Sequence, residues 1–390
     1  MKEEYEISQI ITGFRAAFIE KYHPPASHLK VLTTLEQCRT SVLGGHIDVC
    51  PDCGSIKISY NSCRNRHCPK CQGFEREKWV MARKEDILPV KYFHVVFTLP
   101  ATLHPLCLSN KETAYGALFH AAWGTLSLFA SKEEIQTGAV AILHTWNTQL
   151  GYHPHLHLIV AAGGITKEGT WKDFPNASNN SEFLFPVKAM SKVFRAKYTA
   201  ILDKKQLKID PGVRKELYKK KWVVYCKRPF CQIEKTVEYF GRYSHRVAIT
   251  NRRIKLIDNH KVTFEYKDRQ DGGRNKIMSV DGEDFLQLFC RHILPEKTVR
   301  IRHYGFLAPS NKAKLNQLQQ QFLVPCSPRK RKKIKWMDVC EQITGSKYLQ
   351  CPCCKSAQML RLHTLLPDNH RRPPPFTGTP DFDDFCMLPA

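Results

Sequence analysis

Residues 141–160 read AILHTWNTQLGYHPHLHLIV, and this stretch decides the fold that we expect. In its second half, histidines and apolar side chains alternate with a period of two residues, which is typical of a β-strand with one face in a core. On such a strand His153, His155 and His157 lie on one face, and the apolar residues between them point into the core.

His144 adds a third imidazole from the preceding apolar run, residues 139–146. If this run pairs antiparallel with residues 153–160, His144 comes level with His155 and His157. Neutral imidazole is a good ligand for divalent metals, and three such ligands leave coordination positions open for water or a phosphate oxygen. The pattern therefore predicts a catalytic metal site at these three histidines, with buried structural histidines as the alternative.

Composition indicates a globular protein with a polyanionic partner. The 390 residues contain 60 Lys and Arg against 36 Asp and Glu, which gives a net charge of +24. Such an excess favours nucleic acid over an anionic membrane surface, and the basic segments 204–221, 297–302 and 327–335 would form the track that binds it. The N-terminus resembles no secretion signal, and the longest uncharged run is shorter than the roughly 20 residues of a membrane span, so we expect no membrane association.

The cysteines favour metal binding over disulfides, since we expect a reducing compartment. Two Cys-x2-Cys pairs stand fourteen residues apart, a spacing typical of the two knuckles of a tetrahedral zinc site. The surrounding stretch has too few apolar residues to fold without a metal. We therefore predict structural Zn²⁺ at Cys50, Cys53, Cys68 and Cys71.

Several other potential ligands are left open by the spacing. Near the C-terminus, residues 351–354 form a single further knuckle, CPCC, and one knuckle does not complete a tetrahedral site. Candidates to complete it are Cys326, Cys340 and His363. Candidates to replace a ligand of the first site, or to hold a second ion beside it, are His46, Cys63 and His67.

Residues 238–246, EYFGRYSHR, carry two tyrosines four positions apart. On a helix Tyr239 and Tyr243 share one face and stand one turn apart. A tyrosine hydroxyl near a metal-bound phosphate can act as a nucleophile, while guanidinium groups offset the phosphate charge. Two tyrosines that only filled a core would not need so many arginines beside them. The arginines that we expect to contact DNA are Arg242, Arg246, Arg252 and Arg253, together with Arg64 and Arg66 between the zinc knuckles.

Helical and strand patterns alternate without strict βαβ order, so we predict an α+β fold with a mostly antiparallel sheet flanked by helices. We expect Gly163 and Gly164 to end the second histidine strand. The expected helices span 5–22, 28–43, 73–88, 108–130, 190–204, 234–243, 284–293 and 311–322. The expected strands span 92–99, 139–146, 153–160, 222–225, 247–249, 254–257 and 262–266.

The motifs occur in the order of the HUH endonucleases: strand YFHVVFTLP (92–100), the His-hydrophobe-His strand, and a helix with a tyrosine pair. Over about residues 5–310 the chain resembles the two-tyrosine transposases of the insertion-sequence-91 family. SCRNRHCPKCQ (62–72), LHTWNTQLGYHPHLH (143–157) and YFGRYSHRVAITNRRI (239–254) look like motifs of that family.

The resemblance implies an HUH-endonuclease core behind an N-terminal zinc-binding domain. It assigns the metal ligands to His155 and His157 and the nucleophiles to Tyr239 and Tyr243. The spacing from His144 to His155 is similar to the three-histidine arrangement of relaxases, and Gln149 is the alternative third ligand. The expected domains are a helical and zinc-binding DNA-recognition domain (1–88), the catalytic domain (89–300), a basic C-terminal region (301–366) and a disordered tail (367–390).

The implied reaction is metal-assisted transesterification with a 5′-phosphotyrosine intermediate, in which the protein nicks and transfers single-stranded DNA during rolling-circle-like transposition. The implied cofactors are Mg²⁺ or Mn²⁺ in the catalytic site and Zn²⁺ in the structural site. The implied partners are transposon ends, single-stranded or hairpin, with host replication proteins as further candidates. The expected location is the bacterial cytoplasm, in association with the nucleoid.

Three other functions compete with this interpretation. A plasmid rolling-circle replication initiator or relaxase would use the same chemistry, but the cysteine module favours the transposase. A histidine-triad nucleotide hydrolase would fit the pattern His153-Pro-His155-Leu-His157, but such enzymes are small and not strongly basic. A non-enzymatic zinc protein that binds DNA would leave the histidines and tyrosines without a role.

Overall fold

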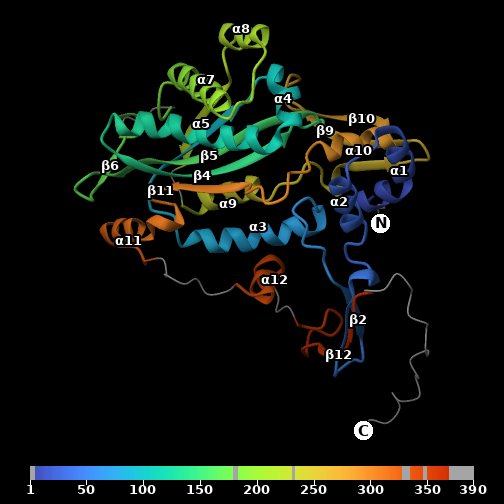
Figure 1. Ribbon diagram of the computed structural model, residues 1–390. Coiled ribbons are helices and arrows are strands. Elements are labelled where there is room, and N and C mark those ends of the chain that lie inside the picture. Colours follow the sequence, from blue (N-terminus) through green and yellow to red (C-terminus); the bar gives the residue numbers. More distant parts are fainter. Residues whose placement is uncertain (1–4, 179–182, 231–232, 327–333, 346–348, 369–390) are drawn as a thin grey trace.

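The computed structural model describes residues 5–178, 183–230, 233–326, 334–345 and 349–368 (Figure 1). The basic run 329–333 and almost all of the tail expected to be disordered lie outside these residues. Within the described residues, no helix has both the length and the apolar character needed to cross a membrane.

A central antiparallel sheet organises the molecule and confirms the α+β prediction. Its strand order is β11-β4-β5-β3-β7, and β6 pairs with β5 at one end. The strands are β3 (Tyr92–Thr98), β4 (Gln136–Trp146), β5 (Tyr152–Ile165), β6 (Trp171–Asp173), β7 (Val224–Phe230) and β11 (Ile301–Gly305).

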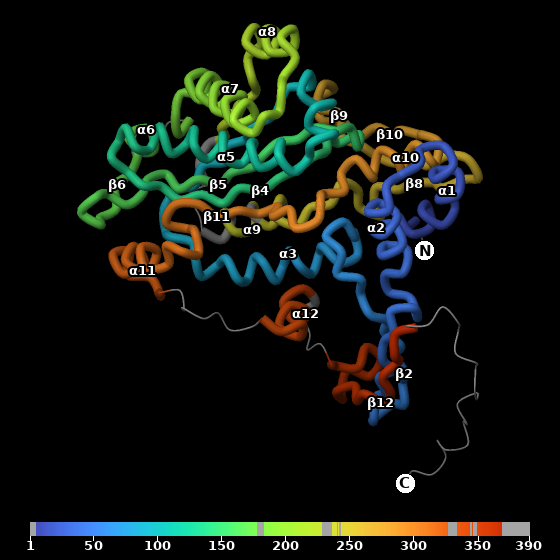
Figure 2. The backbone as a smooth tube through the Cα atoms, in the orientation of Figure 1, coloured from blue at the N-terminus to red at the C-terminus, as the bar shows by residue number. Residues whose placement is uncertain are grey.

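Helices cover both faces of this sheet, as Figures 1 and 2 show. On one face, α5 (Lys111–Ser131) and α7 (Val187–Lys204) pack over a core that includes Phe93, Val95 and Phe97 of β3. On the opposite face lie α9 (Ile233–Ser244) and, beyond it, α3 (Pro69–Lys84). Because side chains of a strand alternate between faces, the residues of β3 between these core residues point toward α9.

A second apolar core lies beside the end of the sheet where β4 turns into β5. The helix α1 (Ile7–Tyr22) packs against α10 (Gly282–Cys290), and α2 (Ala26–Glu36) joins the same core. A three-stranded antiparallel sheet, in the order β10-β9-β8, completes it. Its strands are β8 (Ile254–Ile257), β9 (Lys261–Asp268) and β10 (Arg274–Asp281).

A third, small sheet joins the two ends of the described chain. The strand β1 (Gly45–Val49) pairs with β2 (Ile56–Tyr60) on one side and with β12 (Leu360–Leu365) on the other, both antiparallel. The remaining helices are α4 (His104–Ser109), α6 (Pro175–Ser178), α8 (Pro211–Lys219), α11 (Lys312–Gln321) and α12 (Trp336–Thr344).

Most expected elements are present, and the differences have physical reasons. The strand β5 continues through Gly163 and Gly164 to Ile165, so the prediction that these glycines end it is wrong. Their missing side chains let β4 and β6 approach closely, since a Cβ at either position would collide with a neighbouring carbonyl oxygen. The basic connection 205–221 contains the short helix α8, because the Asp210 side chain accepts hydrogen bonds from the amides of Gly212 and Val213.

Tertiary pairing explains the other differences. Residues 247–249, expected as a strand, are not in a strand, although all three are buried. The strands β10 and β11 were not expected, since their sequences are polar and they are held by pairing with β9 and β4. Contacts also cross the expected domain boundaries. The strand β11, which lies after residue 300, belongs to the central sheet, and α1 of the N-terminal region packs against α10.

Candidate active site and metal centres

Three histidines meet on the face of the central sheet that α9 covers. The predicted antiparallel pairing of β4 with β5 is confirmed, and its register sets His144 directly opposite His155. His157 lies two residues further along β5, on the same face. One ring nitrogen from each of the three histidines lies within 4.8 Å of the other two. Gln149, the alternative third ligand, is exposed in the turn after β4.

The protonation of these histidines suits a cation. Burial lowers the pKa of His155 to about 3 and holds the pKa values of His144 and His157 well below 6.5. Neutral His155 donates its Nδ1 hydrogen to the carbonyl of His153 at 2.6 Å, which leaves a lone pair on Nε2. That Nε2 lies 3.1 Å from Nε2 of His157. Neutral imidazoles this close form a donor set that fits a divalent metal ion.

The helix α9 holds both tyrosines against this cluster. Val237 and Gly241, four residues apart, face α3, where a Cβ at Gly241 would come within 2.7 Å of the Val80 side chain. This packing turns Tyr239 and Tyr243 toward the sheet. The ring centroids of Tyr243 and His157 are 4.2 Å apart.

Hydrogen bonds fix the position of this helix. Nε2 of His144 donates to the carbonyl of Tyr243 at 2.9 Å, which ties α9 to β4. At the C-terminal end of α9, Nη2 of Arg300 donates to the carbonyl of Ser244 at 2.9 Å. Arg300 is half-buried and fills the role of a helix C-cap, so it stabilises the helix that carries the tyrosines.

His94 is a site residue that the sequence analysis missed. It lies on β3, and its Nε2 is 2.8 Å from Nδ1 of His157. Its Nδ1 is 3.0 Å from the hydroxyl of Tyr239, which in turn lies 3.1 Å from the hydroxyl of Tyr243. A continuous hydrogen-bonded row thus connects the histidine cluster to both tyrosines. Strand parity could have revealed it, because His94 alternates with the core residues of β3.

Lys227 of β7 lies next to this row. Its Nζ is 5.5 Å from the ring centroid of Tyr239, within the range of a cation–π contact. Burial of the His94 ring and, to a smaller extent, the positive charge of Lys227 lower the pKa of His94 to about 4. His94 is therefore neutral at neutral pH and has one donor and one acceptor nitrogen to offer.

The predicted DNA-binding arginines fall into two groups. Arg64, Arg246 and Arg252 are exposed. Arg66 and Arg253 instead donate to backbone carbonyls: Arg66 to Thr298 at 2.6 Å, and Arg253 to three carbonyls, including that of Ala248 at 3.2 Å. Arg66 and Arg253 are thus held by the fold, and their assignment as DNA contacts stays a prediction. The side chain of Arg242 lies outside the described residues.

The zinc assignment needs a correction, because the four predicted cysteines belong to two separate clusters. Cys50 and Cys53 lie at the turn of the β1–β2 hairpin, whereas Cys68 and Cys71 lie beyond its base, at the start of α3. A five-residue strand such as β2 is about 17 Å long, so the two pairs cannot share one ion. The sulfur groups that do come together are Cys38, Cys63, Cys68 and Cys71 in one cluster, and Cys50, Cys53, Cys351 and Cys354 in the other.

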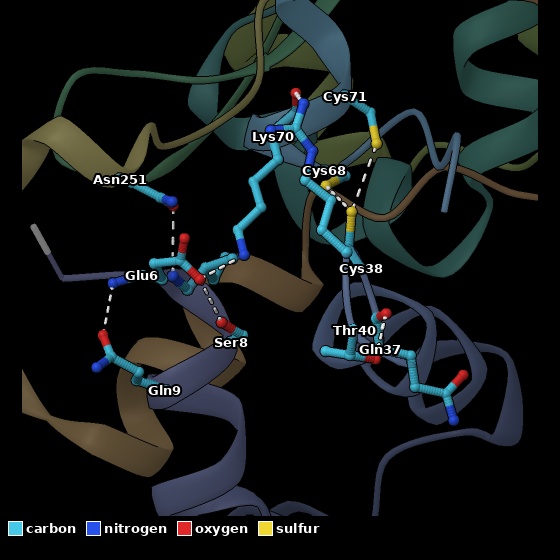
Figure 3. A network of polar contacts seen from close by, with 12 residues as sticks. Glu6, Ser8, Gln9, Gln37, Cys38, Thr40, Cys68, Lys70, Cys71 and Asn251 are labelled. Atoms are coloured by element: carbon cyan, nitrogen blue, oxygen red, sulfur yellow. Dashed lines mark hydrogen bonds and ion pairs between the residues drawn. The ribbon is translucent and has the colours of Figure 1, made fainter. Parts of the chain in front are cut away.

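The first cluster lies between α2 and the start of α3 (Figure 3). The sulfur of Cys38 is 3.5 Å from that of Cys68 and 3.6 Å from that of Cys71, and Cys63 closes the group at 3.7 Å from Cys71. Cys63 is among the ligands that the sequence spacing leaves open, whereas Cys38 has no second cysteine near it in the sequence to mark it as a ligand. Four thiol groups at this spacing fit a closed, structural zinc site.

Ion pairs and hydrogen bonds connect this cluster to its surroundings. Lys70, between two of the cysteines, pairs with Glu6 at the start of α1 (Figure 3). Close by, the amide of Ile7 donates to Asn251 at 3.3 Å, next to the exposed Arg252. The cluster is therefore joined to the part of the chain that follows the tyrosine helix.

Comparison with known proteins matches these two parts of the chain to two family models. Residues 10–99, which include the first cysteine cluster, match the family described as "Transposase zinc-binding domain". Residues 138–314, which include the histidine cluster and the tyrosine helix, match the family described as "Putative transposase".

Two relatives are similar over most of their length. The chain is 37% identical over 358 residues to the protein described as "Putative transposase y4qJ" of Sinorhizobium fredii, covering 85% of this chain and 88% of the relative. It is 28% identical over 298 residues to the transposase for insertion sequence element IS801 of Pseudomonas savastanoi pv. phaseolicola, covering 72% of this chain and 70% of the relative. No solved structure matches the chain.

Proposed function

Since the chain belongs to the insertion-sequence-91 family of transposases and carries their N-terminal zinc-binding domain, we propose that it nicks and transfers single-stranded DNA through covalent tyrosine intermediates. The observation that carries this proposal is the hydrogen-bonded row from the histidine cluster through His94 to Tyr239 and Tyr243. Such a row sets a phenol oxygen beside a cation site, which is the geometry that attack on a phosphate needs.

Tyr239 is the tyrosine that we propose as the first nucleophile. With hydrogen on Nδ1, His157 keeps the Nε2 lone pair that faces His155 and donates from Nδ1 to Nε2 of His94. Neutral His94 then carries its hydrogen on Nδ1 and donates it to the Tyr239 oxygen. The hydroxyl of Tyr243 donates to the same oxygen. Two donors aimed at one phenol oxygen favour its phenolate form.

A divalent cation held by His144, His155 and His157 would polarise the scissile phosphate and offset its negative charge. The imidazole ligands favour Mn²⁺ over Mg²⁺, because Mg²⁺ prefers oxygen ligands. Lys227 and the exposed Arg246 supply further positive charge near the row and the cluster.

In the proposed step, the Tyr239 oxygen forms a bond to phosphorus, and the bond from phosphorus to the 3′ oxygen breaks. The released strand end takes up a proton and leaves as a 3′ hydroxyl. The phosphotyrosine ester conserves the energy of the broken linkage, so rejoining needs no nucleotide hydrolysis. Tyr243 provides a second hydroxyl for a second cut, which strand transfer between two DNA ends requires.

We propose that the zinc-binding region grips the transposon end, as a single strand or hairpin. Arg64 and Arg66 line a cavity of about 800 Å³ between α2 and residues 293–296, and Lys30 of α2 lines the same cavity. Positive side chains around a cavity of this size suit a nucleotide of the DNA backbone. Host replication proteins remain candidate partners for completing the transfer.

The proposal is tested by incubating the protein with labelled single-stranded oligonucleotides and Mn²⁺, followed by denaturing gels. We expect a covalent protein–DNA band that disappears in Tyr239→Phe/Tyr243→Phe while DNA binding persists. Tyr225→Phe is the matched control, because Tyr225 is an exposed tyrosine on β7, and it should keep the band. A band that survives the double substitution would reject the tyrosine mechanism, and cleavage that resists chelation would favour the histidine-triad chemistry.

A further inference from the structure

The second cysteine cluster brings together parts of the chain that are about 300 residues apart. Cys50 and Cys53 follow β1, and Cys351 and Cys354 precede β12. The sulfur of Cys50 is 3.6 Å from that of Cys354, and the sulfur of Cys53 is 3.7 Å from that of Cys351. Neither matched family stretch, 10–99 or 138–314, includes the C-terminal pair. We propose that these four cysteines bind a second zinc ion that fastens the C-terminal segment to the N-terminal zinc-binding region.

The two halves of the site have the same local fold. The N-terminal half reads CPDCGS (50–55) and the C-terminal half CPCCKS (351–356). In each, the residue after the second cysteine adopts a left-handed conformation, with φ of 68° at Gly54 and 59° at Lys355. In each, the amide of that residue donates to the carbonyl of the first cysteine, at 3.0 Å and 3.1 Å. Two such knuckles that face one another are the arrangement of a four-cysteine zinc ribbon.

A backbone hydrogen bond across each knuckle holds its first cysteine. The amide of Cys50 donates to the carbonyl of Ser55 at 2.9 Å, and the amide of Cys351 donates to that of Ala357 at the same distance. Both cysteines are 1% exposed. A hydrogen bond also crosses between the halves, since the Ser356 hydroxyl lies 2.6 Å from the Asp52 carboxylate.

The small apolar core of the surrounding sheet indicates that a bound metal is its main source of stability. Its apolar core consists of the two buried cysteines and Met359, with Ala357 packed against them. The side chains of Ile56, Ile58 and Leu360 are more than half exposed. A three-stranded sheet with so small a core is not stable alone, and a four-thiolate zinc site supplies the missing free energy.

Backbone and side-chain contacts hold the N-terminal and C-terminal parts of this sheet together. A Cβ at Gly44 would lie 2.5 Å from the carbonyl oxygen of Leu365, so the close approach of β12 needs glycine there. Arg361 of β12 pairs with Asp48 of β1 at 3.3 Å. On the way to β12, Trp336 of α12 packs against Phe74 of α3 in a tilted arrangement, with ring centroids 4.1 Å apart. The C-terminal segment therefore packs along the same region that the first zinc cluster supports.

The test measures zinc in the purified full-length chain by mass spectrometry after gel filtration. We expect two zinc ions per chain, and one in Cys351→Ser/Cys354→Ser. Cys353→Ser is the matched control, because Cys353 lies in the same knuckle but outside the cluster, and it should retain two. Two ions retained in the double variant would overturn the proposal. A single ion in the unaltered chain that the double variant also retains would overturn it too, because that ion would belong to the cluster of Cys68.

A second measurement needs no substitution and covers the case in which the variant does not fold. Brief alkylation of the native chain should modify Cys353 and Cys326, which are exposed and outside both clusters. It should spare Cys53 and Cys354, although both are also exposed, until a chelator is added. Equal labelling of Cys353 and Cys354 in the native chain would contradict a bound metal at this site.

Discussion

Replacing His94 by phenylalanine probes the link between the metal site and the nucleophile. Phenylalanine keeps the ring that stacks on His157 at a centroid distance of 5.1 Å but loses both nitrogens. The two lost hydrogen bonds, 2.8 Å to His157 and 3.0 Å to Tyr239, are worth about 0.5–1.5 kcal/mol each. Their sum, about 1–3 kcal/mol, corresponds to a fall of roughly 5- to 150-fold in the rate of adduct formation.

Two milder substitutions separate the two bonds. In His94→Gln the amide can replace the Nε2 contact with His157, so Mn²⁺ affinity should be retained while the adduct rate falls. In His94→Asn the amide can replace the Nδ1 contact with Tyr239, so the Mn²⁺ affinity should fall, by up to roughly tenfold for one lost bond.

The assay is the initial rate of covalent adduct formation at saturating and limiting Mn²⁺, beside titration of Mn²⁺ binding. Tyr92→Phe is the control, because Tyr92 lies on the same strand as His94 and its hydroxyl accepts a buried hydrogen bond from the amide of Leu88 at 3.1 Å. It should lower stability without lowering the adduct rate of the folded protein. If His94→Phe forms the adduct as fast as Tyr92→Phe does, the row has no role in the reaction.

Two further predictions concern the candidate active site, and a third concerns a histidine of β11. On denaturing gels, Tyr239→Phe should abolish the first covalent adduct. Tyr243→Phe should still form it, at a rate lowered about 2- to 12-fold by the loss of one hydrogen bond. An equal loss of adduct in both variants would contradict the assignment of Tyr239 as the first nucleophile. His155→Ala should lose Mn²⁺ binding in calorimetry together with cleavage, and cleavage without binding would separate the two. Burial lowers the pKa of His303 to about 4. Between about pH 6.5 and pH 4 the histidine is therefore protonated in the unfolded chain but neutral in the folded one. The free energy of unfolding falls as the pH falls through this range, by about 1.4 kcal/mol per pH unit for this group. Urea unfolding at pH 7 and pH 5.5 should show a flatter dependence in His303→Gln, and an unchanged slope would contradict a neutral His303.

Local patterns in the sequence predicted the elements that carry the candidate active site. Period-two alternation indicated the second histidine strand, and an apolar run indicated the first. Antiparallel pairing of the two, which the sequence analysis considered, sets His144 opposite His155. The spacing of Tyr239 and Tyr243 indicated a shared helix face. These features depend on residues close together in the sequence, so they could be found without the fold.

The features that sequence reasoning missed depend on distant contacts. Cys38 has no neighbouring cysteine to mark it, and its partners at the start of α3 are some 30 residues away. The knuckle of Cys351 and Cys354 finds its other half only when β12 pairs with β1. Nothing in the sequence shows that the guanidinium group of Arg253 donates to backbone carbonyls from three separate parts of the chain.

The most direct measurement identifies the residue that carries the DNA. The protein is incubated with a single-stranded oligonucleotide and Mn²⁺, digested with protease and nuclease, and the nucleotide-bearing peptide is sequenced by mass spectrometry. A 5′-phosphate linked to Tyr239, formed only when the cation is present, is the result that we predict. A linkage to a histidine of β5, or to a tyrosine outside α9, would contradict the proposed arrangement of cation and phenol oxygen.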